Sequence, residues 1–306
     1  MIEEILLPFV AGQFRTDPHY RDWHIRIVNP LPDTVVLGLH IPEMKKIARQ
    51  LSRQENCRAL LDGFRDAAAS RNDTVLDAGG SGLYQEEMIV WGMMQNYCRM
   101  DTDERLARFS EFVPHIANWA VCDTVCGAAK WAAAKSGRRT GSRLQAGTGA
   151  GCLTDREKIW DWLGRWWSSD KEFEVRFAVI MSMSYFLDGE WRDKTFSRLD
   201  SLDFNRITSQ YRCLGKQSAA KGEDDVNRAV ASGAGYVMPG SRAGTVPGPE
   251  PYYVRMAVAW LLATALARFP DGTRAYLRHA HLPDDVVKMY VRKARESFRT
   301  RGISPF

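Results

Sequence analysis

The sequence predicts an all-α protein, built as a solenoid of short helices, from three observations. Apolar residues recur at spacings of three and four positions along most of the 306-residue chain, as they do on one face of a helix. Few segments show the apolar–polar alternation typical of strands. Residues that open helices stand before several of the periodic segments. Because the predicted helices are short and separated by brief turns, we expect a HEAT or armadillo arrangement, although no strict sequence period is visible.

Three helix starts can be placed from the sequence. Pro42 is tolerated in the first turn of a helix and predicts one over residues 41–54. Thr154 precedes Glu157 by three positions, and Ser169 precedes Glu172 by the same spacing. This is the spacing of a capping box, in which each side chain bonds the backbone N–H of the other residue. The two boxes predict neighbouring helices over 157–167 and 173–187.

Periodicity alone predicts five further helices. They cover residues 83–98, 103–113, 118–134, 252–269 and 284–298. Together these segments account for a single domain spanning residues 1–306.

Two glycine-rich segments interrupt the helical pattern and are predicted as loop insertions, at about 136–153 and 218–251. The first carries a compact positive cluster of Arg138, Arg139 and Arg143. This cluster is a candidate contact for nucleic acid, and an ordinary solvated loop explains it equally well.

Composition narrows the class of protein. A hydrophobic content of 45% is ample for a sizeable core, and the net charge of +5 permits an anionic partner without requiring one. The six cysteines form no dense disulfide framework, and Cys122 and Cys126 lack the spacing of a zinc site, so we expect buried thiols and no metal. The N-terminal run MIEEILLPFVAG is acidic where a signal peptide is basic and is too short to cross a bilayer. We therefore expect a cytoplasmic protein with no membrane partner.

Four residues stand out from their apolar surroundings. Asp123 lies in the run ANWAVCDTVC, and an unpaired buried aspartate is costly. Trp119 precedes Asp123 by four positions, so both lie on one face of a helix. Arg176 interrupts FEVRFAVI, and Trp260 lies within YYVRMAVAWLLATAL. Taken singly, each has an ordinary explanation in packing, capping or local pairing.

Taken together, these residues fall in motifs that resemble those of the AlkD-like DNA alkylation repair proteins. The motifs are N-W-x-x-x-D at 118–123, V-R-F-A-V at 175–179 and YYVRMAVAW at 252–260. Similar runs are VLGLHIPEMKKIA at 36–48 and VRKARESF at 291–298. The resemblance implies a curved HEAT-like solenoid that acts as a DNA glycosylase on duplex DNA, as a monomer, with Trp119, Asp123, Arg176 and Trp260 in its catalytic cleft.

The chemistry that this resemblance implies suits the four residue types. A purine alkylated at N7 or N3 is cationic and leaves without a general acid, so the sugar is what needs stabilising. Asp123 would stabilise the developing positive charge and orient water. Trp119 and Trp260 would contact the cationic nucleotide, and Arg176 would hold a backbone phosphate. No metal or organic cofactor is required. We also expect Arg292, Lys293 and Arg295 near the C-terminus to contact DNA, although a solvated helix face explains that run equally well.

Two functions stay open on the sequence alone. Pro18, Pro30 and Pro32 break the segment in which active glycosylases of the family carry a longer helical element that grips DNA. This departure favours a non-catalytic HEAT-like scaffold that binds nucleic acid or protein, whereas the four cleft residues favour the glycosylase. On the catalytic interpretation we expect Asp123→Asn to abolish base release and to leave the fold close to normal.

Overall fold

The computed structural model describes residues 5–31, 34–72, 83–133, 154–209 and 251–306. Within these ranges the regular secondary structure is helical, and an isolated β-bridge joins Lys171 to Thr208. The all-α prediction is therefore confirmed. The predicted insertion at 136–153 lies outside the described residues, as does all but the last residue of the one at 218–251.

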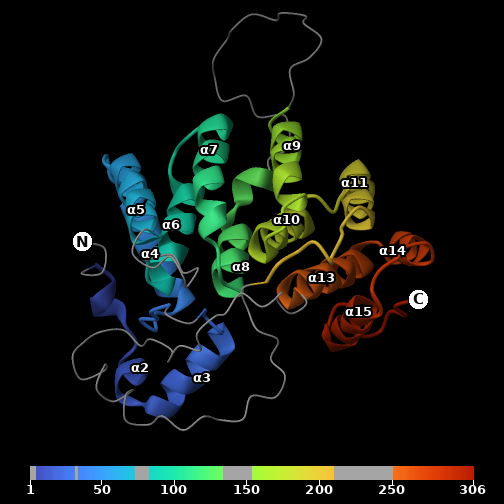
Figure 1. Cartoon of the computed structure of the whole chain (residues 1–306), viewed down its shortest axis with the longest axis horizontal. Coiled ribbons are helices and arrows are strands. Elements are labelled where there is room, and N and C mark those ends of the chain that lie inside the picture. The colour runs from blue at the N-terminus through green and yellow to red at the C-terminus, as the bar shows by residue number, and fades with distance from the viewer. Residues whose placement is uncertain (1–4, 32–33, 73–82, 134–153, 210–250) are drawn as a thin grey trace, which may run out of the picture.

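The helices follow one another across the molecule in chain order, from α4 and α5 at one end to α14 and α15 at the other (Figure 1). Three short 3-10 helices cover Leu7–Phe9, Val113–His115 and Lys130–Ala133. The α-helices are α2 (Gly12–Thr16), α3 (Pro18–Val28), α4 (Ile41–Leu51), α5 (Cys57–Asn72), α6 (Gln85–Tyr97), α7 (Thr102–Phe112), α8 (Trp119–Ala128), α9 (Asp155–Trp167), α10 (Glu172–Tyr185), α11 (Gly189–Asp200), α13 (Tyr252–Arg268), α14 (Pro270–Leu277) and α15 (Asp284–Glu296).

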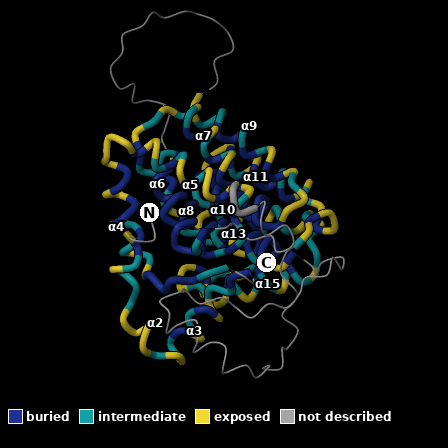
Figure 2. The backbone as a smooth tube through the Cα atoms, turned by 60° about the vertical axis from the view of Figure 1, so that its left-hand side comes forward, coloured by how far each residue is buried: buried dark blue, intermediate teal, exposed yellow. Residues whose placement is uncertain are grey.

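Helices at alternate positions pack side by side. Contacts run from α4 to α6, then to α8, α10, α13 and α15, so these six helices form one continuous row. Helices α5 and α7 pack on α6, α9 packs on α10, and α14 packs on α13. These four helices cover the row. The inner helices α6, α10 and α13 are buried around most of their circumference, whereas α4 and α15 at the ends bury one face only (Figure 2). A helix that is apolar all round needs neighbours on every side, and the row supplies them.

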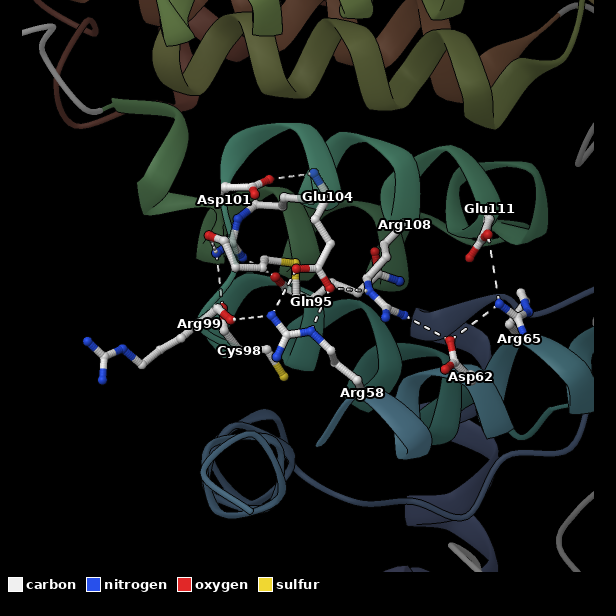
Figure 3. A network of polar contacts seen from close by, with 12 residues as sticks. Arg58, Asp62, Arg65, Gln95, Cys98, Arg99, Asp101, Glu104, Arg108 and Glu111 are labelled. Carbon is white, nitrogen blue, oxygen red and sulfur yellow. Dashed lines mark hydrogen bonds and ion pairs between the residues drawn. The ribbon is translucent and has the colours of Figure 1, made fainter. Parts of the chain in front are cut away.

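A ladder of ion pairs joins two of the covering helices, α5 and α7 (Figure 3). Arg58 donates to Glu104 at 2.8 Å, and Arg108 donates to Asp62 at 3.0 Å and to Glu104 at 3.1 Å. The hydrogen bond from Arg58 is the main cause that lowers the pKa of Glu104 to about 2. Because these side chains are partly exposed, the ladder contributes little to stability and chiefly aligns the two helices.

One predicted cap is confirmed and the other is wrong. Thr154 and Glu157 form the expected capping box at the start of α9. At α10, however, the N-cap is Lys171, and no side chain caps it. The Ser169 hydroxyl instead donates to Glu174 at 2.6 Å, and Glu172 turns inward to bond another helix. A tertiary contact has replaced the local one.

The helix predicted over 118–134 ends earlier than expected, at Ala128. The Trp131 indole donates to Asn96 at 2.6 Å, and the Asn96 amide donates to the Val125 carbonyl at 3.0 Å. These bonds turn the chain back onto α6 and end the helix.

Helices α2, α3, α5, α11 and α14 were not among those predicted. Pro18, predicted to break the N-terminal segment, instead opens α3, and Asp17 caps that helix through the backbone N–H groups of His19 and Tyr20. Proline suits the first position of a helix because its missing N–H has no partner there.

Candidate active site

Asp123 is paired with Arg176. The Arg176 Nε donates to one carboxylate oxygen at 3.0 Å, and its Nη2 donates to the other at 2.7 Å. The two residues come from α8 and α10, which pack side by side in the inner row. Such a two-pronged contact is the strongest arrangement open to an arginine and a carboxylate. The Asp123 side chain is 15% exposed, so the pair meets solvent on the carboxylate side only.

Arg176 is the buried partner, with a side chain only 4% exposed. Its Nη1 donates to the backbone carbonyl of Tyr253 at 2.5 Å, so all three nitrogens contact protein acceptors. Burial alone would lower the pKa of Arg176, but the Asp123 carboxylate outweighs that effect and raises it. The grip on a phosphate predicted for Arg176 remains a prediction, and the geometry favours a different role, holding Asp123 in place.

Trp119 is the first residue of α8 and is partly exposed. Its indole Nε1 donates to the Ile27 carbonyl at 3.2 Å, which ties α8 to the end of α3. Asn118, the N-cap of α8, strengthens this junction by donating to the Val28 carbonyl at 2.7 Å. Trp119 and Asp123 lie one turn apart on the same helix, as the spacing predicted.

Tyr253 and Glu172 complete the cluster, and sequence reasoning did not find them. The Tyr253 hydroxyl accepts a hydrogen bond from Asn29 at 2.6 Å, while its backbone N–H donates to Glu172 at 2.5 Å. Glu172 is 2% exposed and also accepts from the Ser209 hydroxyl. Burial raises the pKa of Glu172, and its bonds from Ser209 and Tyr253 oppose that shift. Glu172 thus satisfies the start of α13, where the helix has no cap of its own.

Trp260 lies outside this hydrogen-bonded cluster. It follows Tyr253 by seven residues on α13, roughly 10 Å along the helix axis. Its side chain is 41% exposed, which is unusual for a tryptophan in an otherwise buried helix. The structure therefore pairs Asp123 with Arg176 and places Trp119 one turn from Asp123. Trp260 is exposed on α13, the helix that packs against α10.

Comparisons of the chain with models of protein families, with curated proteins and with solved structures gave no match. The resemblance carried by the sequence motifs is therefore untested. What the structure adds is a part-exposed carboxylate, fixed by a buried arginine, one turn from a part-exposed tryptophan.

The basic residues predicted to contact DNA fall into two groups. Arg138, Arg139 and Arg143 fall outside the described residues. Arg292, Lys293 and Arg295 lie on α15, at the end of the inner row. Arg292 and Lys293 both pair with Glu296, at 3.3 and 3.2 Å, and the Arg292 side chain is 64% exposed. Exposed pairs of this kind are weak and leave the cations accessible to an anionic partner.

Metal-binding residues do not gather in the described part of the chain, where no three His, Cys, Asp or Glu side chains are placed to share an ion. Cys122 and Cys126 are buried free thiols, and burial raises the pKa of Cys126. Among the same residues, no helix is both long and apolar enough to cross a membrane.

Proposed function

We propose that this chain is a DNA glycosylase that removes cationic N7- or N3-alkylated purines from duplex DNA. The observation that carries the proposal is the Asp123 carboxylate, held at both oxygens by Arg176 and still open to solvent beside Trp119. The row of alternate helices supports a curved HEAT-like solenoid around it.

The reaction breaks the bond between C1′ of the sugar and the purine nitrogen. The electron pair of that bond passes to the purine, which loses its positive charge and leaves without being protonated. Positive charge develops on the sugar, and water then adds to C1′ and gives up a proton. A fixed negative charge beside C1′ stabilises the first step, and the same carboxylate orients the water for the second.

Arg176 acts in this scheme as a positioning residue. Its two bonds fix the carboxylate in one orientation, and its third bond fixes Arg176 itself to the start of α13. A site that is fixed before the reaction has no reorganisation to undergo when charge develops, which is the basis of electrostatic catalysis.

The aromatic residues would hold the cationic base. Trp119 lies one turn from Asp123, and Trp260 is exposed on the adjoining helix. An aromatic face contributes about 0.5–2 kcal/mol toward a cation, depending on how far water is excluded.

A non-catalytic scaffold that binds DNA is the second candidate, and one observation favours it. All three nitrogens of Arg176 contact the protein itself, which is what a purely structural ion pair would show.

Release of free base from a duplex that contains one 7-methylguanine tests the proposal and separates the two candidates. The matched control is the same duplex with hypoxanthine, an uncharged lesion, at that position. We expect 7-methylguanine to be released and hypoxanthine to be retained, because only the cationic base leaves without an acid. Binding of both duplexes without release would favour the scaffold, and absence of binding to either would exclude both candidates.

A further inference from the structure

A second polar site lies between the C-terminal ends of α9 and α11. It is a hollow of about 350 Å³, and the side chains facing it include two cations, three hydroxyls and one carboxylate. These residues are Ser168, Ser169, Arg198, Ser201, Asp203 and Arg206.

Two contacts with Trp160 hold the Arg198 side chain in place. Its Nη2 donates to the Trp160 carbonyl at 2.9 Å, and its guanidinium carbon lies 3.8 Å from the centre of the Trp160 ring. Arg198 also passes close to Gly164 on α9, where a Cβ would lie 3.3 Å from Nη2. A larger residue at position 164 would therefore require the guanidinium to shift by a few tenths of an ångström.

One nitrogen of the Arg198 guanidinium is unsatisfied. Its Nη1 is buried and has no acceptor within the described residues. Burial lowers the pKa of Arg198 to about 10, and Asp161 opposes that shift only in part. A buried donor without an acceptor is costly, so a small movement of the Arg198 side chain that brings Nη1 to an oxyanion in the hollow would be favourable.

The rest of the hollow suits an oxyanion. Arg206 lies on the same rim and is exposed. The hydroxyls of Ser168 and Ser201 donate to helix carbonyls in the unliganded chain and can rotate toward a ligand. Asp203 is the one opposing charge, and it already accepts a hydrogen bond from the Asn205 backbone at 3.0 Å.

We propose that this hollow binds a phosphate group, with Arg198 and Arg206 as its cationic ligands. Ser168 and Ser169 line the hollow, and the chain leads from them through residues 170–171 into α10, whose first residue, Glu172, belongs to the cluster around Asp123. A backbone phosphate of DNA bound at that cluster and a free phosphate ion offer the same chemistry. The proposal stands without the glycosylase activity, because the hollow is built from residues that the activity does not use.

Two measurements test the site and distinguish the sources of phosphate. The first is calorimetric titration of the full chain with inorganic phosphate at pH 7.5, against potassium chloride at equal ionic strength. The second is the affinity for an undamaged duplex over a series of salt concentrations. The variants are Arg198→Gln and Arg206→Gln, and the matched control is Arg192→Gln on the same helix, where Arg192 pairs with Asp193 at 2.7 Å outside the hollow.

We expect Arg198→Gln to weaken phosphate binding about tenfold or more, or to lower the slope of log affinity against log salt by about 0.9, the value for one lost phosphate contact. Loss of phosphate binding identifies the free ion as a ligand, and a reduced slope identifies DNA. If Arg198→Gln does not fold, the exposed Arg206→Gln decides, with the same directions expected. If the wild type binds no DNA, the phosphate titration alone decides. The proposal is wrong if Arg198→Gln and Arg206→Gln both match Arg192→Gln, in their phosphate binding and in the salt dependence of their DNA affinity.

Discussion

Asp123→Asn tests the candidate site most directly, and the structure changes what it should do. The substitution leaves Arg176 with a charge that is 4% exposed and has lost its carboxylate partner. Removing one member of a buried pair costs about 3–5 kcal/mol. Because Asp123 is 15% exposed and asparagine keeps one acceptor oxygen, we expect a smaller loss, about 2–3 kcal/mol. In a chain of 306 residues, each kcal/mol lowers Tm by about 1.5–2 °C, so Tm should fall by roughly 3–6 °C.

A lower Tm of Asp123→Asn is therefore expected whether Asp123 is catalytic or only structural. Distinguishing the two roles requires variants of its partner, Arg176, as well. The informative set is Asp123→Asn, Arg176→Met and the double variant, each measured for Tm and for release of 7-methylguanine. Removing both charges should recover part of the stability, because neither residue is then left unpaired. Base release should stay about a hundredfold to a thousandfold below wild type in the double variant, because the charge that stabilises the sugar is still missing.

A second ion pair, buried on its arginine side, supplies the control. Arg255 donates to Asp285 at 2.5 Å, with side chains 10% and 36% exposed, and this pair joins α13 to α15. Asp285→Asn should lower Tm and spare base release. If the Asp123→Asn, Arg176→Met double variant released 7-methylguanine as fast as the wild type, the catalytic role of Asp123 would be refuted. An unchanged Tm in Asp123→Asn would refute the stability argument.

Three further outcomes are expected. Trp260→Ala should change the free energy of unfolding by less than about 1 kcal/mol, because the side chain is 41% exposed, and should weaken base release by about 2- to 30-fold, measured on the 7-methylguanine duplex. Burial raises the pKa of Glu172, so ionisation of this carboxyl opposes folding. The stability advantage of the wild type over Glu172→Gln, measured as the difference in their free energies of unfolding, should be largest below pH 4.5. It should fall as the pH rises above that value, in urea titrations from pH 4 to 7. A flat difference would show that Glu172 titrates alike in the folded and unfolded chain. Thr154→Ala should cost about 1 kcal/mol through loss of the capping box, measured by thermal unfolding.

The sequence predicted the row of six helices, from α4 to α15, better than the helices that lie outside it. Helices α6, α10 and α13 each contain a run of consecutive apolar residues, and such runs are easily recognised. Helices α5 and α11 have a high charge content and bury narrower faces, so the periodic spacing of their apolar residues is weak. Two helix ends were predicted wrongly because a distant residue decides them. The Asn96 side chain does so beyond Ala128, and the backbone N–H of Tyr253 does so at Glu172.

The candidate site shows the same division. Residue types and spacing were sufficient to select Asp123, Trp119 and Arg176 before their contacts were known. The third bond of Arg176 goes to a backbone carbonyl 77 residues away, and every residue carries such a carbonyl. The side-chain pattern of the sequence does not predict a contact of that kind. The role of Arg176 as a positioning residue therefore follows only from the fold.

Glu172 also ties together two parts of the chain that are distant in sequence. It accepts hydrogen bonds from Ser209 and from Tyr253, which stand on either side of residues 210–250. Because one carboxylate holds both residues, a substitution at Glu172 would release two attachments at once, whereas a substitution at Ser209 would release only one. The carbonyl of the same Tyr253 accepts from Arg176, so the position of Asp123 depends on Glu172 through the start of α13.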